Sequence, residues 1–493
     1  MSNLFKDQTK KSDQYTEVTN LQLLSIDKLK ELYSYPLNSD LKIRELYLSK
    51  SKKRLFIFYL NPIVNTEKLR ESIIHPLLNS GEESHLSTII DAEEVKSIDS
   101  VASGVNAINN GAALILEEGT QIGYIVDIAK FESRNIEKSQ NENIIKGPKE
   151  GFTESLNMNL SLIRKIIRSE HLITETIPIN RLETESATLL YLKNVANEKI
   201  IENVRNRISH IEVDFVHNIE KLEQLIEERP YSLFPSILYT ERPDRVVSYL
   251  EEGHIVILTG ASSASLVAPA TFWSFFHTGE DHYLRFLYGN FSRLVRLLGL
   301  FITLFMSALY VGITNFHHEM LPPDLLLAIA STREKVPFPV VVEVLIMEFS
   351  FELIREAGLR IPSPLGPTIG IVGALILGQA AVQANIISPI IVIVVAFSGL
   401  ASFTISDISM NYSLRLLRFM FISIAGMMGI YGLGAIFVSF ICYLTSLTSF
   451  GVPFLAPLTP TYKSAQDTIF RKVIAHEVFR PGFTFPKLKR RKS

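Results

Sequence analysis

Residues Ile361 to Ser406 read IPSPLGPTIGIVGALILGQAAVQANIISPIIVIVVAFSGLASFTIS and contain no Asp, Glu, Lys, Arg or His. A second stretch, from Phe419 to Tyr462, is equally free of these residues. About 20 apolar residues suffice to cross the hydrocarbon core of a bilayer, and soluble domains do not leave runs of this length without charge. The second half of the chain is therefore predicted to be a helical integral membrane domain.

Outward from this region the composition changes, because the first half of the 493-residue chain is polar. The whole chain has 49 basic and 51 acidic residues and a net charge of −2, which argues against nucleic acid as a partner because phosphate binding needs a basic surface. The single cysteine, Cys442, cannot form an internal disulfide. The opening residues lack the apolar core of a signal peptide, so the first domain is predicted to stay in the cytosol.

The polar half contains an internal echo, that is, two short segments whose patterns recur later in the same order. Phe58-Tyr59-Leu60, before a predicted helix, is answered by Leu190-Tyr191-Leu192 before another. Residues 105–111 (VNAINNG), followed by an apolar run, are answered in the same order by residues 247–253 (VSYLEEG). Two co-linear echoes favour a duplicated α/β unit over chance reuse of short strings. The same alignment makes residues 254–276 soluble strands and not a membrane helix.

The predicted fold class is an α/β cytosolic domain of two related subdomains, followed by an α-helical integral membrane domain of about four spans plus an amphipathic or re-entrant helix. The predicted parts are a flexible segment (1–39), the two subdomains (40–146 and 147–285), the membrane domain (286–448) and a basic cytosolic tail (449–493). The basic residues of the tail are Lys487, Lys489, Arg490, Arg491 and Lys492. Their charge favours a position beside anionic lipid.

The uncharged runs predict four membrane spans, at 297–316, 368–384, 388–406 and 419–446. Arg285, Arg293 and Arg296 precede the first span, so the chain is predicted to enter the membrane from the cytoplasm. Four spans return the tail to that side. They also place Arg415 and Arg418 outside, against the usual bias of basic residues toward the cytoplasm.

Between the first two spans, residues 337–361 have helical spacing and carry several charges. At 100° per residue, Glu348, Glu352, Arg355 and Glu356 share one side, and Glu343 lies nearly opposite Glu352. This helix could lie in the membrane interface, re-enter the bilayer or line an aqueous cavity. Two roles remain open for its charges: a packed ion network that holds helices together, or the lining of an ion path or gate.

The second span and its approach present small residues at every fourth position: Gly366, Gly370, Ala374 and Gly378. Small residues at this spacing let helices pack closely in lipid, either within one chain or between copies. Gln379 and Gln383 follow on the next turns. Their amides are candidates for interhelical hydrogen bonds or for a pore-facing or gating position.

Motifs of several enzyme classes are absent from the sequence, which has no Walker loop, no GxGxxG after a predicted strand, and no CxxC, HExxH or GxSxG. The pair His317-His318 beside Glu319 predicts a solvated loop, because adjacent side chains on a helix do not face one metal. The sequence therefore predicts neither an enzyme nor a cofactor or metal site.

Motifs spread over roughly residues 40 to 460 resemble one known family. They are 147–152 (GPKEGF), 240–245 (TERPDR), 332–339 (TREKVPFP, with Pro337 and Pro339), 368–374 (TIGIVGA), 378–381 (GQAA) and 449–454 (SFGVPF, with Gly451 and Pro453). In this order they resemble the A subunits of the GerA family of bacterial spore germinant receptors.

The resemblance implies a protein of the spore inner membrane that acts with a transporter-like B subunit, the favoured nutrient binder, and a lipoprotein C subunit. In that family nutrients trigger the release of ions, and the A subunit is thought to oligomerise around an ion path. The expected partners are thus the B and C subunits, membrane lipid and further copies of the chain.

The sequence departs from the family pattern at three positions: Lys149 replaces an Arg, Gln383 stands where an acid is common, and Ser406 stands where a proline is often found. If an acid at the second position sets ion selectivity, this chain would select through other groups, such as Glu343 or Glu352. The alternatives to a receptor subunit are a paralogous sporulation membrane protein that amplifies germination, a scaffold, or a secondary transporter. A neighbouring gene for a B-type protein would favour the receptor subunit over the paralogue.

Overall fold

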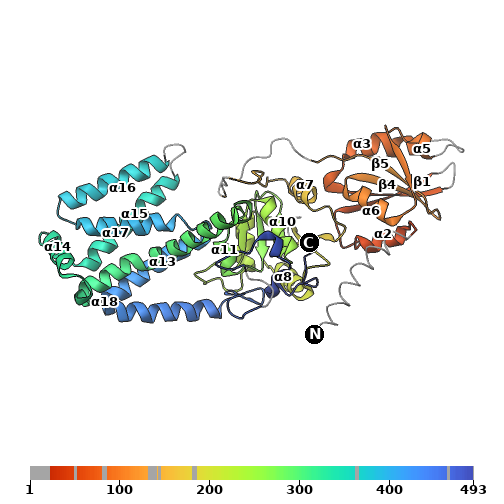
Figure 1. Cartoon of the computed structure of the whole chain (residues 1–493). Coiled ribbons are helices and arrows are strands. Elements are labelled where there is room, and N and C mark those ends of the chain that lie inside the picture. The colour runs from red at the N-terminus through yellow and green to blue at the C-terminus, as the bar shows by residue number, and fades with distance from the viewer. Residues whose placement is uncertain are drawn as a thin grey trace. The chain divides into compact units, whose positions relative to one another are not determined.

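The computed structural model describes residues 23–48, 53–79, 86–131, 142, 146–179, 186–360, 366–462 and 467–491. The chain divides into two compact units, whose elements are labelled in Figure 1. Unit 1 contains Met1–Pro230, Ile237–Pro269 and Val478–Ser493, and unit 2 contains Tyr231–Ser236 and Ala270–Glu477. The division falls after 269 and 477, whereas the sequence predicted it after 285 and 448, because the segments flanking the long helices pack with those helices.

Unit 1 holds two five-stranded sheets in which every pair of neighbours is antiparallel. The first has the order β1-β2-β4-β5-β3, with β1 (Leu41–Leu48), β2 (Lys53–Leu60), β3 (Val95–Ile98), β4 (Ala112–Glu117) and β5 (Gly123–Asp127). The second has the order β6-β7-β9-β10-β8, with β6 (Leu172–Pro178), β7 (Ser186–Leu192), β8 (Leu238–Thr240), β9 (Ile255–Thr259) and β10 (Ser265–Ala268).

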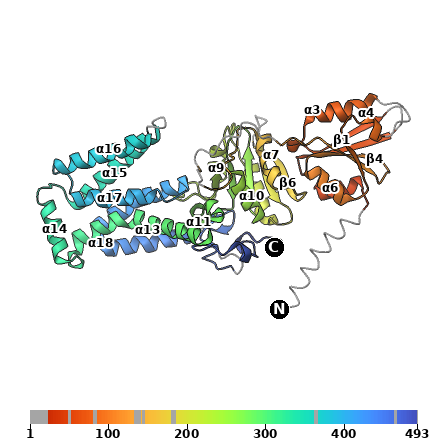
Figure 2. The same cartoon turned by 45° about the horizontal axis from the view of Figure 1, so that its top comes forward.

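Helices cover both faces of the first sheet (Figure 2). One face is covered by α2 (Ile26–Leu32) and α6 (Val101–Asn109), and the other by α3 (Thr66–Lys68), the π-helical turn η2 (Leu69–Ile74), α4 (His75–Asn79) and α5 (Leu86–Ile89). The second subdomain contains α7 (Leu156–Ile166), α8 (Glu198–Ser209), α9 (Ile219–Ile226) and α10 (Pro243–Glu251). Short 3-10 turns lie at η1 (Asn61–Ile63) and η5 (Gly482–Thr484).

The two sheets share one strand order, which confirms the predicted duplication. The register agrees as well. Ile57 pairs with Ile115 between β2 and β4, and Leu189 pairs with Ile257 between β7 and β9. These are equivalent pairs under the alignment of the two sequence echoes, so the echoes mark the same places in two copies of one fold. Residues 255–259 and 265–268 form strands, as predicted, although Phe272–Phe276 is helical.

Local signals are duplicated too. The side-chain oxygens of Asn65 and Asn197 accept hydrogen bonds from backbone N–H groups in the first turns of α3 and α8, which satisfies donors that a helix start leaves free. Gly111 and Gly253 follow α6 and α10 with φ of 91° and 92°, a conformation that favours glycine.

The first subdomain begins earlier than predicted. Leu29 and Tyr33 are fully buried against the first sheet, and the Tyr33 hydroxyl is 2.9 Å from Asn109 Oδ1. Residues 24–33 therefore belong to the core and not to a flexible segment, because apolar side chains in α2 fill one face of the sheet. Residues 1–22 lie outside the described part of the chain.

The last described residues pack on the second subdomain. Lys487 Nζ lies 2.9 Å from Glu198 Oε2, and Arg491 Nη2 lies 2.6 Å from Glu252 Oε1. The hydroxyl of Thr484 also donates to the carbonyl of Glu252 at 3.0 Å. The charges of Lys487 and Arg491 are thus matched by acids of unit 1, and the position of the basic tail beside lipid stays a prediction.

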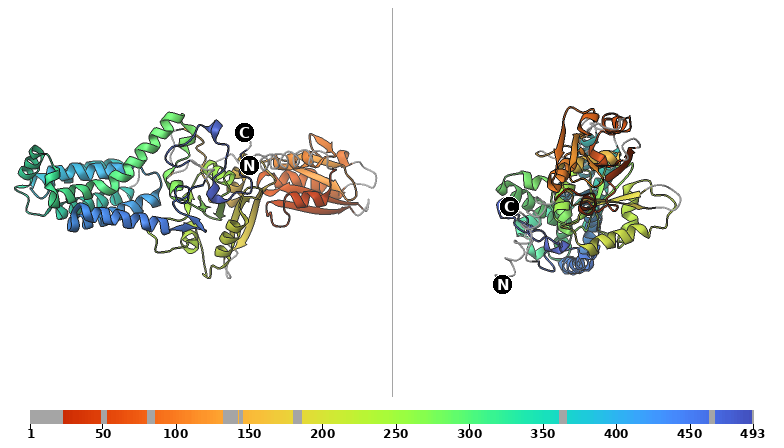
Figure 3. Two further views of the ribbon diagram at one scale, coloured as in Figure 1. Left: turned by 60° about the horizontal axis from the view of Figure 1, so that its bottom comes forward. Right: turned by 90° about the vertical axis from the view of Figure 1, so that its right-hand side faces the viewer.

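Unit 2 is helical. Its main helices are α13 (Phe286–Phe316), α14 (Pro323–Arg333), α15 (Val340–Arg360), α16 (Gly366–Gln383), α17 (Pro389–Ser402) and α18 (Ile408–Ser446). Shorter elements are α11 (Phe272–Phe276), α12 (Glu280–Tyr283), the 3-10 turns η3 (His318–Met320) and η4 (Ile474–His476), and the hairpin β11 (Thr448–Ser449) and β12 (Val452–Pro453). Helices α13 and α18 run side by side (Figures 1 and 3).

Two of these helices are long and apolar enough to cross a membrane by length and composition, Phe286–Phe316 with 31 residues and Ile408–Ser446 with 39. Helix α18 is kinked at Gly429, whose φ of 62° and ψ of −145° are not helical, and the rings of Phe421 and Phe440 lie 6.2 Å apart. The predicted span 419–446 is therefore not one continuous helix. Helix α17 has 14 residues, fewer than the 20 or so that a span needs, so the count of four spans stays a prediction. Arg415 and Arg418 lie in α18, because this helix begins at Ile408 and not near Phe419. Their position on the outer side of the membrane stays a prediction.

Candidate functional site

A buried ion pair joins helices α15 and α18. The Nη2 atom of Arg418 lies 2.9 Å from Oε2 of Glu348 and 2.8 Å from Oε1 of Glu352. The side chain of Glu348 is 0% exposed, and that of Arg418 is 1% exposed. Charges taken out of water are costly unless each is paired, so these three residues must act as one unit.

Neighbouring side chains complete this network. The hydroxyl of Ser307, on α13, donates to Glu348 Oε1 at 2.6 Å, and Arg418 Nη1 donates to the hydroxyl of Ser398, on α17, at 3.1 Å. Arg415 makes a second ion pair with Glu352. The network thereby ties α15 to α13, α17 and α18 through polar contacts.

Arg355 lies one turn further along α15 and binds α17. Its Nη2 atom donates to the carbonyl of Gly399 at 3.1 Å and to the hydroxyl of Ser402 at 2.8 Å. The guanidinium also lies 4.4 Å from the centroid of the Phe403 ring, a cation–π contact. Glu356, beside it, is exposed.

Glu343 occupies a separate buried position near the start of α15. Its side chain is 0% exposed, and Arg333, at the end of α14, lies 3.3 Å from its Oε1 atom. The backbone N–H of Ser388 donates to Oε2 at 3.0 Å. Ser388 precedes α17, so the carboxylate sits at a helix N-terminus, where the exposed N–H groups and the helix dipole favour negative charge.

The polar side chains described in α16 face outward. Gln379 and Gln383 are both exposed. Gly378 is buried, and a Cβ atom at this position would lie 3.2 Å from Val392 Cγ1 and 3.8 Å from Met347 Cε. Gly378 therefore packs within the chain. The surroundings of Gly366, Gly370 and Ala374 lie outside the described part.

The spacing of the charges on α15 anticipated this arrangement. Glu348 and Glu352 share the network on one side of the helix, and Glu343 meets different partners. The sequence reasoning missed the role of Arg418 and Arg415, because both were placed outside the membrane and away from the acids of α15. Their spacing of three residues, within an otherwise uncharged 55-residue stretch from 408 to 462, was the available signal of a helical pair facing the acids.

The motif residues 449–454 form the hairpin at the end of α18. Its two turn residues, Phe450 and Gly451, have φ of 48° and 83°. The hydroxyl of Ser449 accepts from the Ala270 N–H at 2.9 Å and donates to the Ser236 carbonyl at 2.6 Å. The hairpin thus holds three separate segments of unit 2 together. Pro453 lies in β12.

The other motif prolines lie at the entry to α15. Pro339 immediately precedes this helix and its carbonyl accepts hydrogen bonds from the N–H groups of Val342 and Glu343, at 3.0 and 3.1 Å. Pro337 lies in the connection from α14. Proline suits this place because it lacks the N–H group that a helix start cannot satisfy.

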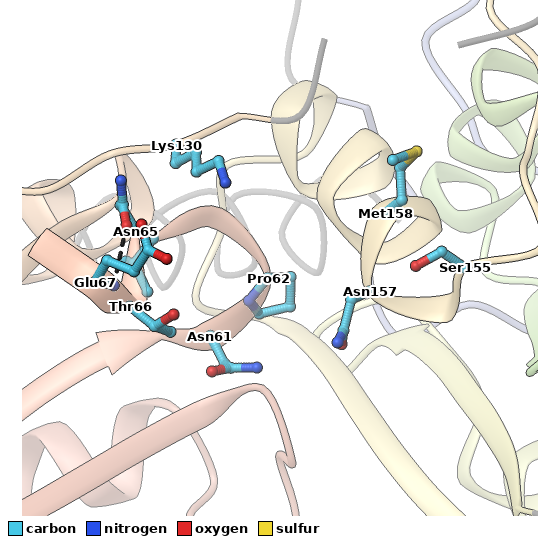
Figure 4. A pocket seen from close by; sticks show the side chains of 10 residues that line it. Asn61, Pro62, Asn65, Thr66, Glu67, Lys130, Ser155, Asn157 and Met158 are labelled. Carbon is cyan, nitrogen blue, oxygen red and sulfur yellow. Dashed lines mark hydrogen bonds between the residues drawn. The ribbon is translucent and has the colours of Figure 1, made fainter. Parts of the chain in front are cut away.

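Unit 1 contains a half-open pocket of about 270 Å³ between the η1–α3 segment and α7. Its lining residues include Asn61, Pro62, Asn65, Thr66, Glu67, Lys130, Ser155, Asn157 and Met158 (Figure 4). The side-chain oxygen of Asn65 already accepts from the N–H groups of Glu67 and Lys68. Among the described residues, no cluster of three or more His, Cys, Asp or Glu could hold a metal ion. The charge network is the stronger candidate site.

A duplicated α/β unit, joined to helices that can cross a membrane and that bury paired charges, defines a membrane protein in which polar contacts hold the helices in register. Residues 27–483 match the family model described as Bacillus/Clostridium GerA spore germination protein. The chain belongs to this family. Subunits of this family are not enzymes.

Individual proteins show the same relationship. The chain is 38% identical over 443 residues to spore germination protein KA of Bacillus subtilis, covering 88% of this chain and 81% of that protein. It is 37% identical over 426 residues to the uncharacterized membrane protein YfkQ of Bacillus subtilis, covering 84% and 82%. The crystal structure of the N-terminal domain of the A subunit of the Bacillus megaterium spore germinant receptor GerK3 matches with 26% identity and a TM-score of 0.39, covering 52% of this chain and 97% of that one.

Proposed function

We propose that this chain is the A subunit of a nutrient germinant receptor in the spore inner membrane, and that several copies assemble into an ion-conducting channel. In this proposal unit 1 lies in the cytosol, a transporter-like B subunit binds the nutrient, and a lipoprotein C subunit completes the receptor. Family membership supports the receptor role, and the distribution of polar groups in unit 2 supports the channel.

The observation that carries the channel proposal is a difference among the polar side chains of unit 2: the buried acids are paired within the chain, and the amides of α16 are exposed. Glu343, Glu348 and Glu352 each have an arginine partner within the chain. Gln379 and Gln383, on an uncharged helix, are exposed instead. The hydrogen-bonding groups of an amide that faces hydrocarbon are left unsatisfied. Each unsatisfied group costs several kcal/mol, as an unsatisfied backbone N–H or C=O group does.

A second copy of the chain, or water between copies, would satisfy these amides. Gln379 and Gln383 are four residues apart, so they lie on one side of α16 and form one polar strip. Gly378 faces α15 and α17, so the packing of α16 within the chain leaves the strip free. An oligomer that turns the α16 helices toward a common axis would line that axis with amides.

In this proposal the buried ion network makes the helices that it links move together, and their movement displaces the polar strip of α16. Glu348, Glu352 and Arg418 connect α15 to three other helices, and α16 follows α15 directly in the chain. Because breaking one ion pair leaves a buried charge without a partner, the four helices shift together or not at all. A signal from a partner subunit would in this way reach α16 as a rigid displacement.

The test is ion conductance in planar bilayers, measured for the purified chain alone and with its B and C partners, with and without nutrient. We expect a current that needs the chain and rises with nutrient. In Gln383→Glu, the reversal potential under a KCl gradient should shift toward the potassium equilibrium potential, because a carboxylate ring favours cations. Glu356→Gln, which changes an exposed charge outside the strip, is the control and should leave selectivity unchanged.

If no condition gives current while the complex still binds nutrient, the chain is a scaffold that relays the signal to another channel. If a current flows but Gln383→Glu and Glu356→Gln both leave its selectivity unchanged, the path does not pass along α16.

A further inference from the structure

In the first three turns of α13, charged side chains are buried and large apolar side chains are exposed. Arg293 and Arg296 are buried, at 0% and 6% exposed. Large apolar side chains of the same turns are exposed: Phe286 39%, Leu287 79%, Tyr288 60%, Phe291 60%, Leu294 37% and Val295 38%. A helix surrounded by water would place these two classes of side chain the other way round.

The buried arginines are neutralised within unit 2. Arg293 Nε lies 3.0 Å from Asp281 Oδ2, and Arg293 also pairs with Asp467. Arg296 pairs with Asp281 and donates through Nη1 to the carbonyl of Phe276 at 2.6 Å. This cluster of two arginines and two aspartates carries no net charge, so the charged groups of these turns are paired inside unit 2 while large apolar side chains face outward.

A second segment joins this surface. Residues 470–474 follow the hairpin and dock on α13 through Arg471, whose Nη2 donates to the Leu284 carbonyl at 2.8 Å and whose N–H donates to Asn290 Oδ1 at 2.9 Å. Beside this buried arginine the apolar side chains again face outward: Phe470 is 56% exposed, Val473 44% and Ile474 61%. Lys472 is exposed among them.

The length of α13 indicates that a lipid bilayer covers this exposed apolar surface. Its 31 residues span about 46 Å at 1.5 Å per residue. With an ordinary tilt of about 20°, this equals the roughly 40–45 Å of a bilayer with its headgroup regions, and exceeds the roughly 30 Å of the hydrocarbon core. The exposed apolar face also continues into the span, where Leu298 is 52% and Phe301 42% exposed.

We propose that the first three turns of α13 and the segment 470–474 together form a lipid-interface collar, inserted at the boundary between headgroups and acyl chains. The internal ion cluster makes this possible, because arginines at that depth would otherwise face lipid. Tyr288 provides the amphipathic ring that membrane interfaces favour, and Arg285 and Lys472, both exposed, lie where anionic headgroups can bind them. The collar is independent of channel activity.

The single tryptophan of the chain, Trp273, allows a fluorescence test. In a Trp273→Phe background, the full chain carries one new tryptophan at Phe291 or at Ile474 and is reconstituted into phosphatidylcholine–phosphatidylglycerol vesicles. Some of the lipids carry bromine at acyl carbons 6 and 7, and others at carbons 11 and 12. Phe301→Trp, about 15 Å further along α13, is the deep control, and Phe215→Trp, at an exposed position of unit 1, is the aqueous control.

We expect tryptophan at 291 and at 474 to be quenched more by the shallow bromines than by the deep ones, with the order reversed at 301 and no lipid quenching at 215. Quenching of 291 and 474 by aqueous acrylamide, without quenching by either lipid, would overturn the proposal. Protection from both quenchers would also overturn it, because a protein partner would then cover the face. If Trp273→Phe lowers the yield, nitroxide labels at the same positions in Cys442→Ser report the same depths from collisions with oxygen.

Discussion

Arg418→Met is the sharpest test of the buried network. The guanidinium lies 2.9 Å from Glu348 and 2.8 Å from Glu352, distances at which each pair attracts by about 6 kcal/mol at an effective dielectric constant of 20. Desolvation offsets much of this attraction. The substitution leaves Glu348, 0% exposed, without a cationic partner, and losing one member of a buried pair costs about 3–5 kcal/mol.

The double variant Arg418→Met with Glu348→Met separates the cost of an orphaned charge from the value of the pair. Glu352 keeps Arg415, so the double variant should lose only about 1–2 kcal/mol, chiefly from the unpaired hydroxyl of Ser307. The assay is the melting temperature of the detergent-solubilised chain, for which a loss of 3–5 kcal/mol is a fall of about 6–20 °C in a unit of this size. Arg285→Met, at an exposed position, is the control. The reasoning is refuted if the single variant melts at or above the temperature of the double variant.

Three further predictions concern other positions of unit 2. Gly378→Leu should separate α16 from α17, because even a Cβ atom lies 3.2 Å from Val392, and it should lower the yield of folded protein on size-exclusion chromatography, whereas an unchanged yield would exclude close packing there. Gly451→Ala should cost about 1–3 kcal/mol, because its φ of 83° strains a side chain, while Gly434→Ala, in open space on α18, should be neutral or stabilising; melting temperatures that do not differ would contradict this. The hydrogen bond to Asp467 raises the pKa of His282, so protonation stabilises unit 2 below pH about 6.5 and this contribution is lost as the pH rises through the raised pKa. The melting temperature of His282→Asn should fall furthest below that of the wild type near pH 6 and match it near pH 9, and a constant gap would rule out the ion pair.

Much of unit 1 could be read from the sequence because its signals are local and occur twice. The strings ending in Leu60 and Leu192 mark equivalent strands, and Gly111 and Gly253 mark equivalent turns. A repeated pattern is stronger than either copy alone, since chance rarely reproduces order and spacing together. The core role of Tyr33 escaped prediction, because a short helix in a polar stretch has no local signal for the sheet face that it covers.

Unit 2 was harder to read because its chemistry depends on contacts between helices that are distant in sequence. Spacing along one helix showed that Glu348 and Glu352 share a side. It could not show that Arg418, 70 residues beyond Glu348, lies between them. Helices α13 and α18 both begin earlier than their uncharged runs suggest, and the arginines in their first turns are paired with acids within unit 2.

The measurement that tests the channel proposal most directly is cysteine modification during current recording. In a Cys442→Ser background, Gln383→Cys is placed on the polar strip of α16, and Leu377→Cys, 41% exposed, is placed on another side of the same helix. A positively charged methanethiosulfonate reagent is then added during nutrient-evoked current through the reconstituted receptor. We predict that the reagent blocks the current at position 383 and leaves it unchanged at position 377. Current that persists with position 383 fully modified, as shown by mass spectrometry, would contradict an ion path along α16.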